Sequence, residues 1–139
     1  MGLYYASSIE ETHSIACSIA KELKPGDILA FFGQLGAGKT TFIKAIAKEI
    51  VGISEHAVSS PTFQYLNIYQ GEPPLYHFDL YRLRGAEDFL DMGFDECLEQ
   101  HGICCIEWAE RIHAILPPKT ISISMTHVGD NIRTIEVSK

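Results

Sequence analysis

Eight consecutive residues, Gly33 to Thr40, carry the spacing G-x-x-x-x-G-K-T. Glycines let successive backbone N–H groups turn toward one anion, and a helix that starts directly afterwards points its positive end at the same anion. In this pattern Lys39 reaches the β- and γ-phosphates of a nucleotide, and the Thr40 hydroxyl binds Mg²⁺. The sequence therefore predicts a nucleoside triphosphate site, with phosphate contacts from Gly33, Gly36, Ala37, Gly38, Lys39, Thr40 and Thr41.

Two acidic residues follow apolar runs and are candidates for the chemistry of hydrolysis. A phosphate loop binds, but hydrolysis also needs an acid near the metal or the attacking water. Glu107 comes directly after the apolar residues 103–106, and Asp79 lies near the end of residues 76–80. We expect Glu107 to hold Mg²⁺ or to orient the water. Asp79 either shares the metal, holds the loop or caps a turn.

Other polar and aromatic residues allow a functional and a plain structural interpretation. Thr62 could add a hydroxyl to Mg²⁺ or belong to an ordinary turn, and Arg82 and Arg84 could stabilise charge or form surface ion pairs. For Trp108 we favour a place in the core over a stacking surface. His77 shares a strand face with Asp79 without necessarily touching it, so we predict no catalytic role for His77.

The elements around the motif have the expected order of a buried strand, the loop and a helix, at residues 27–32 and 40–50. Ser8 and Glu11 form a capping pattern that opens a helix over residues 8–23. Residues 85–100 are helical in composition with a break at Gly93, and residues 109–116 form a short helix. Further strands are expected at residues 3–6, 63–69, 75–80, 102–106, 120–126 and 132–137. This mixture predicts a three-layer α/β domain whose sheet combines parallel and antiparallel strands.

Length and composition limit the classes of protein. The chain has 139 residues, 46% of them hydrophobic, and a net charge of −7. We expect one domain over residues 1–139, located in the cytoplasm, because no apolar run approaches a membrane span and no signal peptide is present. The four cysteines form no C-x-x-C pair and are expected to be reduced thiols.

The acidic residues are unevenly distributed along the chain. Residues 86–110 hold eight of the 18 acids and no Lys or Arg. A chain without a basic stripe is poorly suited to gripping nucleic acid directly. The acidic stretch is either a docking face for a basic protein partner or a solvated surface.

Four segments occur in a specific order: G-Q-L-G-A-G-K-T-T-F, S-P-T-F, H-F-D-L-Y-R-L and I-E-W. Together they closely resemble the TsaE family, also called YjeE, over about residues 8–137. The resemblance implies a small ATPase, dependent on ATP and Mg²⁺, with a phosphate-loop NTPase fold. It further implies a subunit that works with the TsaD and TsaB proteins and supports repeated turnover of the complex that makes tRNA threonylcarbamoyl-adenosine. Such a subunit is expected to be slow alone and to meet tRNA only indirectly.

The resemblance also implies roles for particular residues. Lys39 and Thr40 match the phosphate and Mg²⁺ ligands, and Asp79 and Glu107 match the acids of the site. Thr12, in the pair Glu11-Thr12, matches a position beside the adenine, and Arg133 matches a late arginine that borders the nucleotide. One position departs from the pattern: the family usually has an acid where this chain has Gln34. An amide can orient a water but cannot act as a base.

Three other functions use the same loop. A small-molecule kinase usually needs an arginine-rich acceptor pocket, and this chain has only four arginines. A GTPase generally selects guanine with N-K-x-D, which does not occur in the chain. A nucleotide-gated binding module, in which the bound state matters rather than turnover, differs from the ATPase only by degree.

Overall fold

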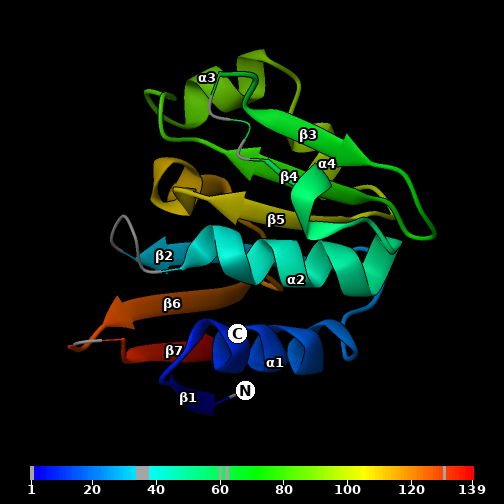
Figure 1. The fold of residues 1–139 in the computed structure, drawn as a ribbon. Coiled ribbons are helices and arrows are strands. Elements are labelled where there is room, and N and C mark those ends of the chain that lie inside the picture. Colours follow the sequence, from blue (N-terminus) through cyan, green and yellow to red (C-terminus); the bar gives the residue numbers. More distant parts are fainter. Residues whose placement is uncertain (1, 34–37, 60, 62, 130) are drawn as a thin grey trace.

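A seven-stranded mixed sheet runs through the whole molecule in the order β1-β7-β6-β2-β5-β4-β3, as Figure 1 shows for the computed structural model. The structure describes residues 2–33, 38–59, 61, 63–129 and 131–139. The strands are β1 (Gly2–Ala6), β2 (Ile28–Gly33), β3 (Leu66–Tyr69), β4 (Leu75–Asp79), β5 (Ile103–Glu107), β6 (Ile121–His127) and β7 (Arg133–Ser138).

The centre of the sheet is parallel and its edges are antiparallel. β2 pairs in parallel with both β5 and β6, and β4 pairs in parallel with β5. β3 runs antiparallel to β4 at one edge, and β7 and β1 add antiparallel pairs beyond β6 at the other. The parallel strands end at one edge of the sheet, so residues at their carboxyl ends are brought together there.

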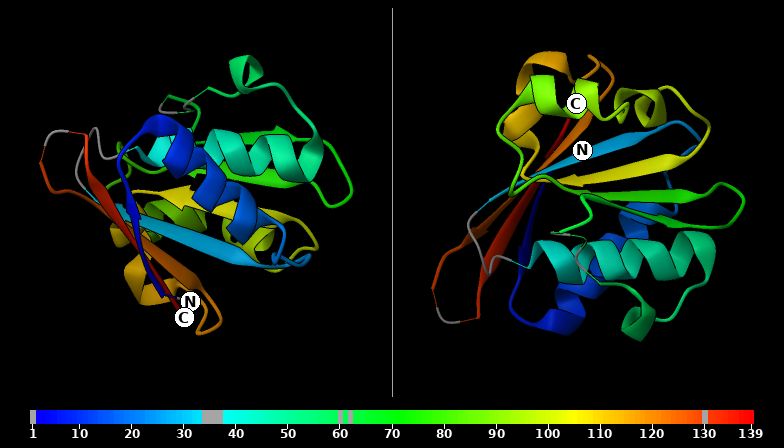
Figure 2. Two further views of the ribbon diagram at one scale, coloured as in Figure 1. Left: turned by 60° about the horizontal axis from the view of Figure 1, so that its bottom comes forward. Right: turned by 90° about the horizontal axis from the view of Figure 1, so that it is seen from above.

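Helices cover both faces of the sheet (Figure 2). One face carries α1 (Ile9–Ala20) and α2 (Lys39–Val51), with the short 3₁₀ turn η1 (Glu55–Ala57) following α2. The opposite face carries α3 (Ala86–Asp91), α4 (Asp95–Leu98) and the 3₁₀ segment η2 (Ala109–Ile115). The predicted three-layer α/β fold with a mixed sheet is therefore confirmed.

The two faces of the sheet bury different side chains. Beneath α1 and α2 the core is mainly aliphatic, with Ile43, Ile46 and Leu75 fully buried, and Phe31 meets Phe42 edge-on at 5.6 Å between ring centroids. Beneath α3 and α4 the core is aromatic: the rings of Phe78, Phe89 and Phe94 pack mutually at 5.4–5.6 Å. Side chains of a strand alternate between faces, so β4 and β5 contribute to both cores.

Several predicted boundaries were wrong for identifiable reasons. The strand expected from residue 63 begins at Leu66, because Tyr65 has a φ of 66° and Phe63 is 76% exposed. The first helix ends at Ala20 rather than residue 23. The short helix expected at residues 109–116 is present at residues 109–115, as a 3₁₀ segment with a kink at Ile112.

Two local predictions about the helices are confirmed. Gly93 adopts a φ of 75° and separates α3 from α4. Ser8 caps α1, because its side chain accepts a hydrogen bond of 3.1 Å from the Glu11 N–H. The return bond of a capping box shifts by one residue, since the Glu11 carboxylate accepts from the N–H of Ser7. This bonding with Ser7 lowers the pKa of Glu11.

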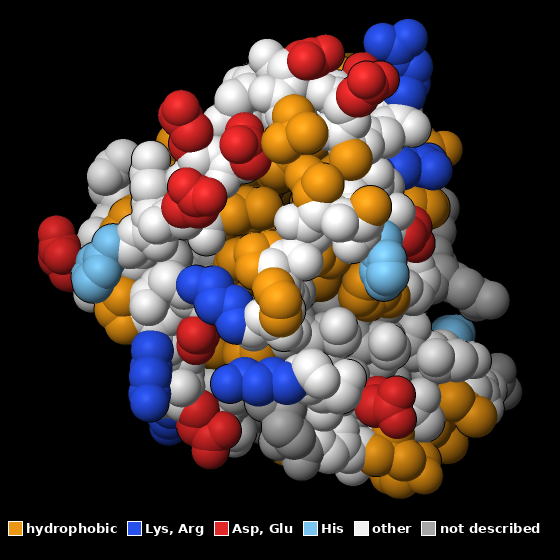
Figure 3. All heavy atoms as spheres, turned by 180° about the vertical axis from the view of Figure 1, so that it is seen from behind, with side chains coloured by type: hydrophobic (Ala, Val, Ile, Leu, Met, Phe, Trp, Pro, Cys, Tyr) orange, Lys and Arg blue, Asp and Glu red, His pale blue; other side chains and the backbone are white. Residues whose placement is uncertain are grey.

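The acidic stretch lies largely on the face that carries α3 and α4. Figure 3 shows acidic side chains gathered over the upper part of this view, beside exposed hydrophobic side chains. Glu87, Asp91, Glu96 and Glu99 are exposed, whereas Glu107 is buried and faces the other side of the sheet. Within the described residues, no helix is long and apolar enough to cross a membrane.

Candidate functional site

The N-terminus of α2 lies where β2 ends, so the phosphate motif spans the junction between a buried strand and a long helix. Gly38 is the N-cap of α2, and Lys39, Thr40 and Thr41 form its first turn. N–H groups in the first turn of a helix have no partner within the helix, so they are available to an anion. Of the residues expected around the phosphates, Gly36 and Ala37 lie outside the described part of the chain, as do Gln34 and Thr62.

Both described glycines of the motif have a positive φ, and a side chain would clash at Gly33 and be tightly packed at Gly38. Gly33 has a φ of 142°, and a Cβ there would lie 2.3 Å from the carbonyl oxygen of Met125 in β6. Gly38 has a φ of 100°, and its Cβ would lie 3.3 Å from Nε of Arg133 and 3.4 Å from Cε of Met125. The motif is thus packed against β6 and the start of β7. This places Arg133 beside the last glycine of the loop.

The side chain of Lys39 bonds back to the first residue of the motif, Gly33. Its Nζ donates a hydrogen bond of 2.9 Å to the carbonyl oxygen of Gly33 and lies 4.9 Å from the centroid of the Trp108 ring. The residue is only 6% exposed. A lysine ammonium this well covered must be paired with an acceptor or an anion. Its position between both ends of the motif suits it to bind a phosphate group there.

Glu107 connects three elements at the end of β5. Its Oε1 accepts a hydrogen bond of 3.4 Å from the Thr40 hydroxyl at the start of α2, and its Oε2 lies 2.7 Å from Nε2 of His77 in β4. Glu107 is 5% exposed and His77 is fully buried. The sequence placed Glu107 at a strand tip, and the structure brings it to the phosphate motif 67 residues away.

Asp79 lies next to Glu107 because the two residues are partners in the β4–β5 register. Its Oδ1 accepts a hydrogen bond of 3.0 Å from the N–H of Tyr81, so the carboxylate caps the turn that follows β4. Asp79 is 5% exposed, on the same face of the sheet as Glu107. The structure therefore contains the turn-capping contact that was one of the expected alternatives, and it places this contact beside Glu107.

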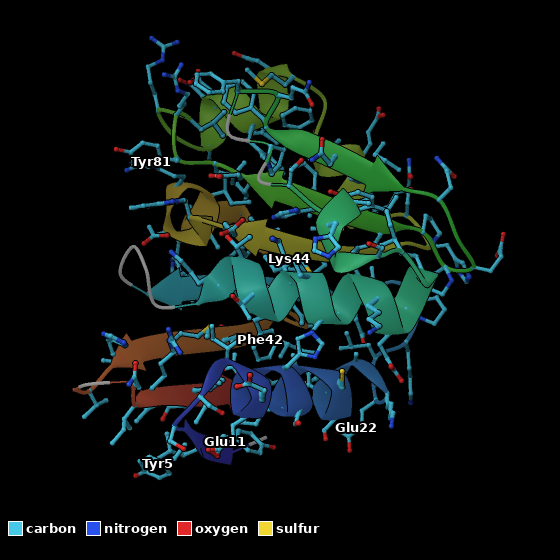
Figure 4. The ribbon with its side chains drawn as sticks, in the orientation of Figure 1. Tyr5, Glu11, Glu22, Phe42, Lys44 and Tyr81 are labelled. Carbon is cyan, nitrogen blue, oxygen red and sulfur yellow. The ribbon has the colours of Figure 1, made fainter. Side chains whose placement is uncertain are left out.

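The remaining predicted site residues lie farther along α1 and α2. Thr41 lines a groove of about 200 Å³ together with Ile9 and His13 of α1, Lys44 of α2 and His56 of η1. Figure 4 labels Lys44 on α2 and Glu11 on α1. Thr12 is buried, and its hydroxyl donates a 3.2 Å hydrogen bond to the carbonyl oxygen of Ser8. The predicted place of Thr12 beside an adenine stays a prediction.

The sequence interpretation missed the contact made by His77. Positions 77 and 79 share a strand face, and the register pairs them with Cys105 and Glu107 of β5. A histidine two residues before the strand-end acid was the available signal. It pointed to the correct face, but the sequence alone does not give the pairing of β4 with β5.

Trp108 was expected mainly in the core, and this expectation is only partly right. The residue is half-buried and has a φ of 59°, which turns the chain sharply after β5. Its ring packs on Tyr81 at 4.9 Å and lies under both Lys39 and Arg111. Figure 4 shows Tyr81 at the end of the molecule where this cluster lies.

The two arginines that follow Tyr81 make surface contacts. Arg82 stacks on Phe63 with 4.3 Å between the guanidinium carbon and the ring centroid. Arg84 forms an ion pair of 3.1 Å with Asp88, four residues along the chain. The Arg84 guanidinium lowers the pKa of Asp88. For Arg84, the plain surface interpretation agrees with the structure.

The cysteines are free thiols, as predicted. Burial raises the pKa of Cys104 to about 12 and raises the pKa of Cys105 well above its usual value. Both therefore stay protonated near neutral pH and act as small apolar side chains. Among the described residues, no three His, Cys, Asp or Glu side chains are grouped as a metal cage.

The oxygen donors at the site nevertheless fit Mg²⁺. This ion prefers hard oxygen ligands and usually takes one or two from the protein, with substrate phosphates and waters supplying the rest. The Thr40 hydroxyl and the Glu107 carboxylate converge at the N-terminus of α2, where an anion is also favoured. This donor set suits a magnesium–nucleotide complex better than an ion held by the protein alone.

Comparison with known proteins shows the family of this chain. Residues 6–135 match the model of the family described as threonylcarbamoyl adenosine biosynthesis protein TsaE. The chain is 40% identical to the TsaE protein of Treponema pallidum, covering 94% of this chain and 96% of that protein. It is 44% identical to the TsaE protein of Bacillus subtilis, covering 91% of this chain and 78% of that protein.

A solved structure shares the fold. The crystal structure of YdiB from Bacillus subtilis superposes with a TM-score of 0.82 at 36% identity and covers 97% of this chain and 82% of that one. The mixed sheet and the family match extend over nearly the same residues, and the phosphate motif lies within both. The chain belongs to the TsaE family of threonylcarbamoyl adenosine biosynthesis proteins.

Proposed function

We propose that this protein binds ATP with Mg²⁺ and hydrolyses it at the junction of β2 and α2. The observation that carries the proposal is that Glu107 of β5 contacts Thr40 in the first turn of α2, directly after Lys39, whose ammonium bonds back to Gly33 at the end of β2. A buried cation, a hydroxyl and a buried carboxylate are the groups that phosphoryl transfer to water requires.

Each group has a distinct task in this mechanism. The first-turn N–H groups of α2 and the Lys39 ammonium bind the phosphates and stabilise the charge that develops on them. Thr40 and Glu107 would hold Mg²⁺, which would supply positive charge to offset that of the phosphates. Glu107, fixed by Thr40 and His77, either supports the metal through Thr40 or orients the attacking water. Asp79 holds the turn after β4 beside it.

The rest of the nucleotide extends along α1 and α2 in this proposal. Support comes from the groove that Thr41 lines with residues of α1 and η1, and from Arg133, which packs against Gly38. Gly36 and Ala37 contribute loop contacts, and Thr12 contributes from α1. His13, Lys44 and His56 give the groove polar groups that suit a nucleotide.

We further propose that the ATPase serves the synthesis of tRNA threonylcarbamoyladenosine in the cytoplasm, together with TsaD and TsaB. The names of the relatives support the pathway. The net charge of −7 and the exposed acids on α3 and α4 support contact with proteins rather than direct binding of tRNA. In this proposal the isolated chain hydrolyses ATP slowly, and TsaD and TsaB raise its rate of hydrolysis.

The test is phosphate release from Mg·ATP by the purified chain, alone and with TsaD, TsaB and tRNA. Strong stimulation by the partners supports the proposal. Omitting TsaD or TsaB singly identifies which protein is needed, and Lys39→Ala in the same mixture controls for contaminating ATPases. No stimulation, with hydrolysis unchanged by Lys39→Ala, contradicts it.

Gln34 favours one alternative, a nucleotide-gated binding module. An amide after the first loop glycine cannot act as a base. Tight ATP binding without hydrolysis in the full mixture would support this alternative. Hydrolysis that appears in Gln34→Asp would then identify position 34 as the reason. A kinase has no comparable support, since the family match covers residues 6–135.

A further inference from the structure

A fully buried histidine contacts the acid of the proposed ATP site. His77 is 0% exposed and lies on β4, with Nε2 2.7 Å from Oε2 of Glu107. The contact joins neighbouring parallel strands, because His77 pairs with Cys105 and the carboxylate of Glu107 reaches back by two positions. The other oxygen, Oε1, accepts from the Thr40 hydroxyl.

The two contacts together fix the direction of the Glu107 side chain. A carboxylate accepts hydrogen bonds, so the imidazole Nε2 carries the proton and donates it to Oε2. With Oε2 held by β4, the plane of the carboxylate is set and Oε1 is turned toward α2. Without the histidine, only the longer 3.4 Å contact with Thr40 is left among the hydrogen bonds the structure gives this carboxylate.

Apart from Glu107, the described residues around His77 give no reason for an imidazole. Leu75, Ile103 and Cys105 flank it on the same face of β4 and β5, and all three are buried. Its Nδ1 has no hydrogen-bond partner among the described residues. An apolar side chain would remove the unpaired Nδ1, but it would leave Oε2 of the buried Glu107 without its donor. The contact with Glu107 is therefore the reason that the structure gives for an imidazole at this position.

We propose that His77 is a positioning residue that holds the Glu107 carboxylate in the orientation needed to support Mg²⁺ at Thr40 and to orient water. The inference rests on the proposed ATPase function. It extends that function to a residue whose hydrogen bond, among the described residues, is to Glu107.

The experiment compares His77→Leu with His77→Gln. Leucine removes the donor, whereas the glutamine amide keeps an N–H at about the distance of Nε2. For each protein we would measure kcat and KM for ATP with TsaD, TsaB and tRNA, and separately the Mg²⁺ concentration that half-saturates binding of a non-hydrolysable ATP analogue. His77→Leu should raise the half-saturating Mg²⁺ concentration and lower kcat, each by about 10- to 100-fold. Losses of this size are usual when the hydrogen-bond partner of a metal-site carboxylate is removed. KM for ATP should change little, and His77→Gln should recover most of the loss.

A double-mutant cycle separates positioning from general damage to the fold. Once Glu107→Ala has removed the carboxylate, His77→Leu should change kcat by no more than about twofold, because nothing is left to position. Tyr76→Phe is the matched control. It removes a 2.6 Å hydrogen bond to Gln100 from the opposite face of the same strand and should leave Mg²⁺ dependence unchanged.

Additive effects of His77→Leu and Glu107→Ala would overturn the inference, as would a His77→Leu protein with normal Mg²⁺ dependence and kcat. If Glu107→Ala itself has normal kcat, the proposed role of Glu107 fails and this inference fails with it. If His77→Leu does not fold, His77→Asn replaces it, because the shorter amide keeps polarity but does not reach Oε2. Normal behaviour of a folded His77→Asn protein would then overturn the inference.

Discussion

The two faces of the sheet, built partly from the same two strands, are put to different use. On one face β4 and β5 contribute Tyr76, Phe78, Cys104 and Ile106 to the aromatic core beneath α3 and α4. On the other face the same strands contribute Leu75, Ile103 and Cys105, and then His77, Asp79 and Glu107. The comparison shows that His77, Asp79 and Glu107 lie on the face covered by α1 and α2 (the α2 face), from the middle of β4 to the carboxyl ends of both strands.

The two faces of the same strands therefore differ in what their side chains contribute, one to stability and the other to the proposed chemistry. The aromatic face consists of ring contacts and aliphatic packing, which stabilise the fold and offer no chemistry. The buried polar side chains on the α2 face include Lys39, His77, Asp79 and Glu107, whose desolvation works against stability. Substitutions on the α2 face should therefore change ATP binding or hydrolysis, and substitutions on the aromatic face should change the free energy of unfolding.

Lys39→Ala should give the largest effect on the functional side. It removes the buried ammonium that contacts the Gly33 carbonyl oxygen, and with it the main cation expected at the phosphates. We expect ATP binding, measured by titration calorimetry, to fall below detection, while the thermal unfolding midpoint stays close to that of the unchanged protein. Unchanged turnover would exclude the phosphate motif from the mechanism.

Glu107→Ala should separate binding from hydrolysis. Loss of a positioned acid or base usually costs about 10²- to 10⁴-fold in rate. ATP affinity should change far less, because the first turn of α2 and Lys39 are left in place. Single-turnover hydrolysis and equilibrium binding on the same preparation test this. An equal loss of both would make Glu107 a structural residue or one essential for holding the metal.

Phe89→Ala tests the opposite face. Phe89 is fully buried and contacts both Phe78 and Phe94. Removing a buried ring of this kind costs about 3–5 kcal/mol of unfolding free energy, which urea denaturation measures. The ATP affinity of the fraction that remains folded should be unchanged. A weakened affinity at constant folded fraction would break the proposed separation between the faces.

Alkaline pH should lower the free energy of unfolding through two adjacent buried thiols, one on each face of the sheet. Cys104 faces the aromatic core and Cys105 the α2 face, and burial raises both pKa values above the ordinary 9.0, that of Cys104 to about 12. The unfolded thiols lose protons first, so the stabilisation is complete below about pH 9 and is lost as pH rises toward 12. The slope is about 1.4 kcal/mol per pH unit for each thiol.

Urea denaturation at several pH values measures this slope. Cys104→Ala is the matched control, because it removes one thiol and should reduce the slope while leaving Cys105 in place. An identical slope in the control would show that other groups, such as Tyr76, whose pKa burial also raises, cause the loss of stability.

The sequence predicted those parts of the fold and site that depend on neighbouring residues. The phosphate motif, the strand before it and α2 after it are set by local spacing, and Glu107 follows directly from the apolar run of β5. The contact between His77 and Glu107 depends on the register of two strands 30 positions apart. Side-chain alternation along one strand does not contain that register.

Other misses have physical causes that a pattern of apolar residues does not express. Phe63 looks like the start of a strand, yet it is exposed and stacks with Arg82. Tyr65 and Trp108 adopt a positive φ, which bulky residues rarely do. The turns at these two residues therefore could not be predicted from residue type. The roles of Thr12 and Arg133 at a nucleotide stay predictions.

The close approach of Gly33 to β6 bears on how variants of the phosphate motif should be interpreted. Position 33 faces the carbonyl of Met125, a rigid backbone atom, whereas position 38 faces the movable side chains of Arg133 and Met125. In a library of all substitutions, loss of activity at 33 would therefore report that the sheet has been forced apart, whatever the residue does for ATP. Two glycines of one motif can therefore resist substitution for different reasons, one because a neighbouring strand's backbone is too close and the other because of its positive φ at the start of α2.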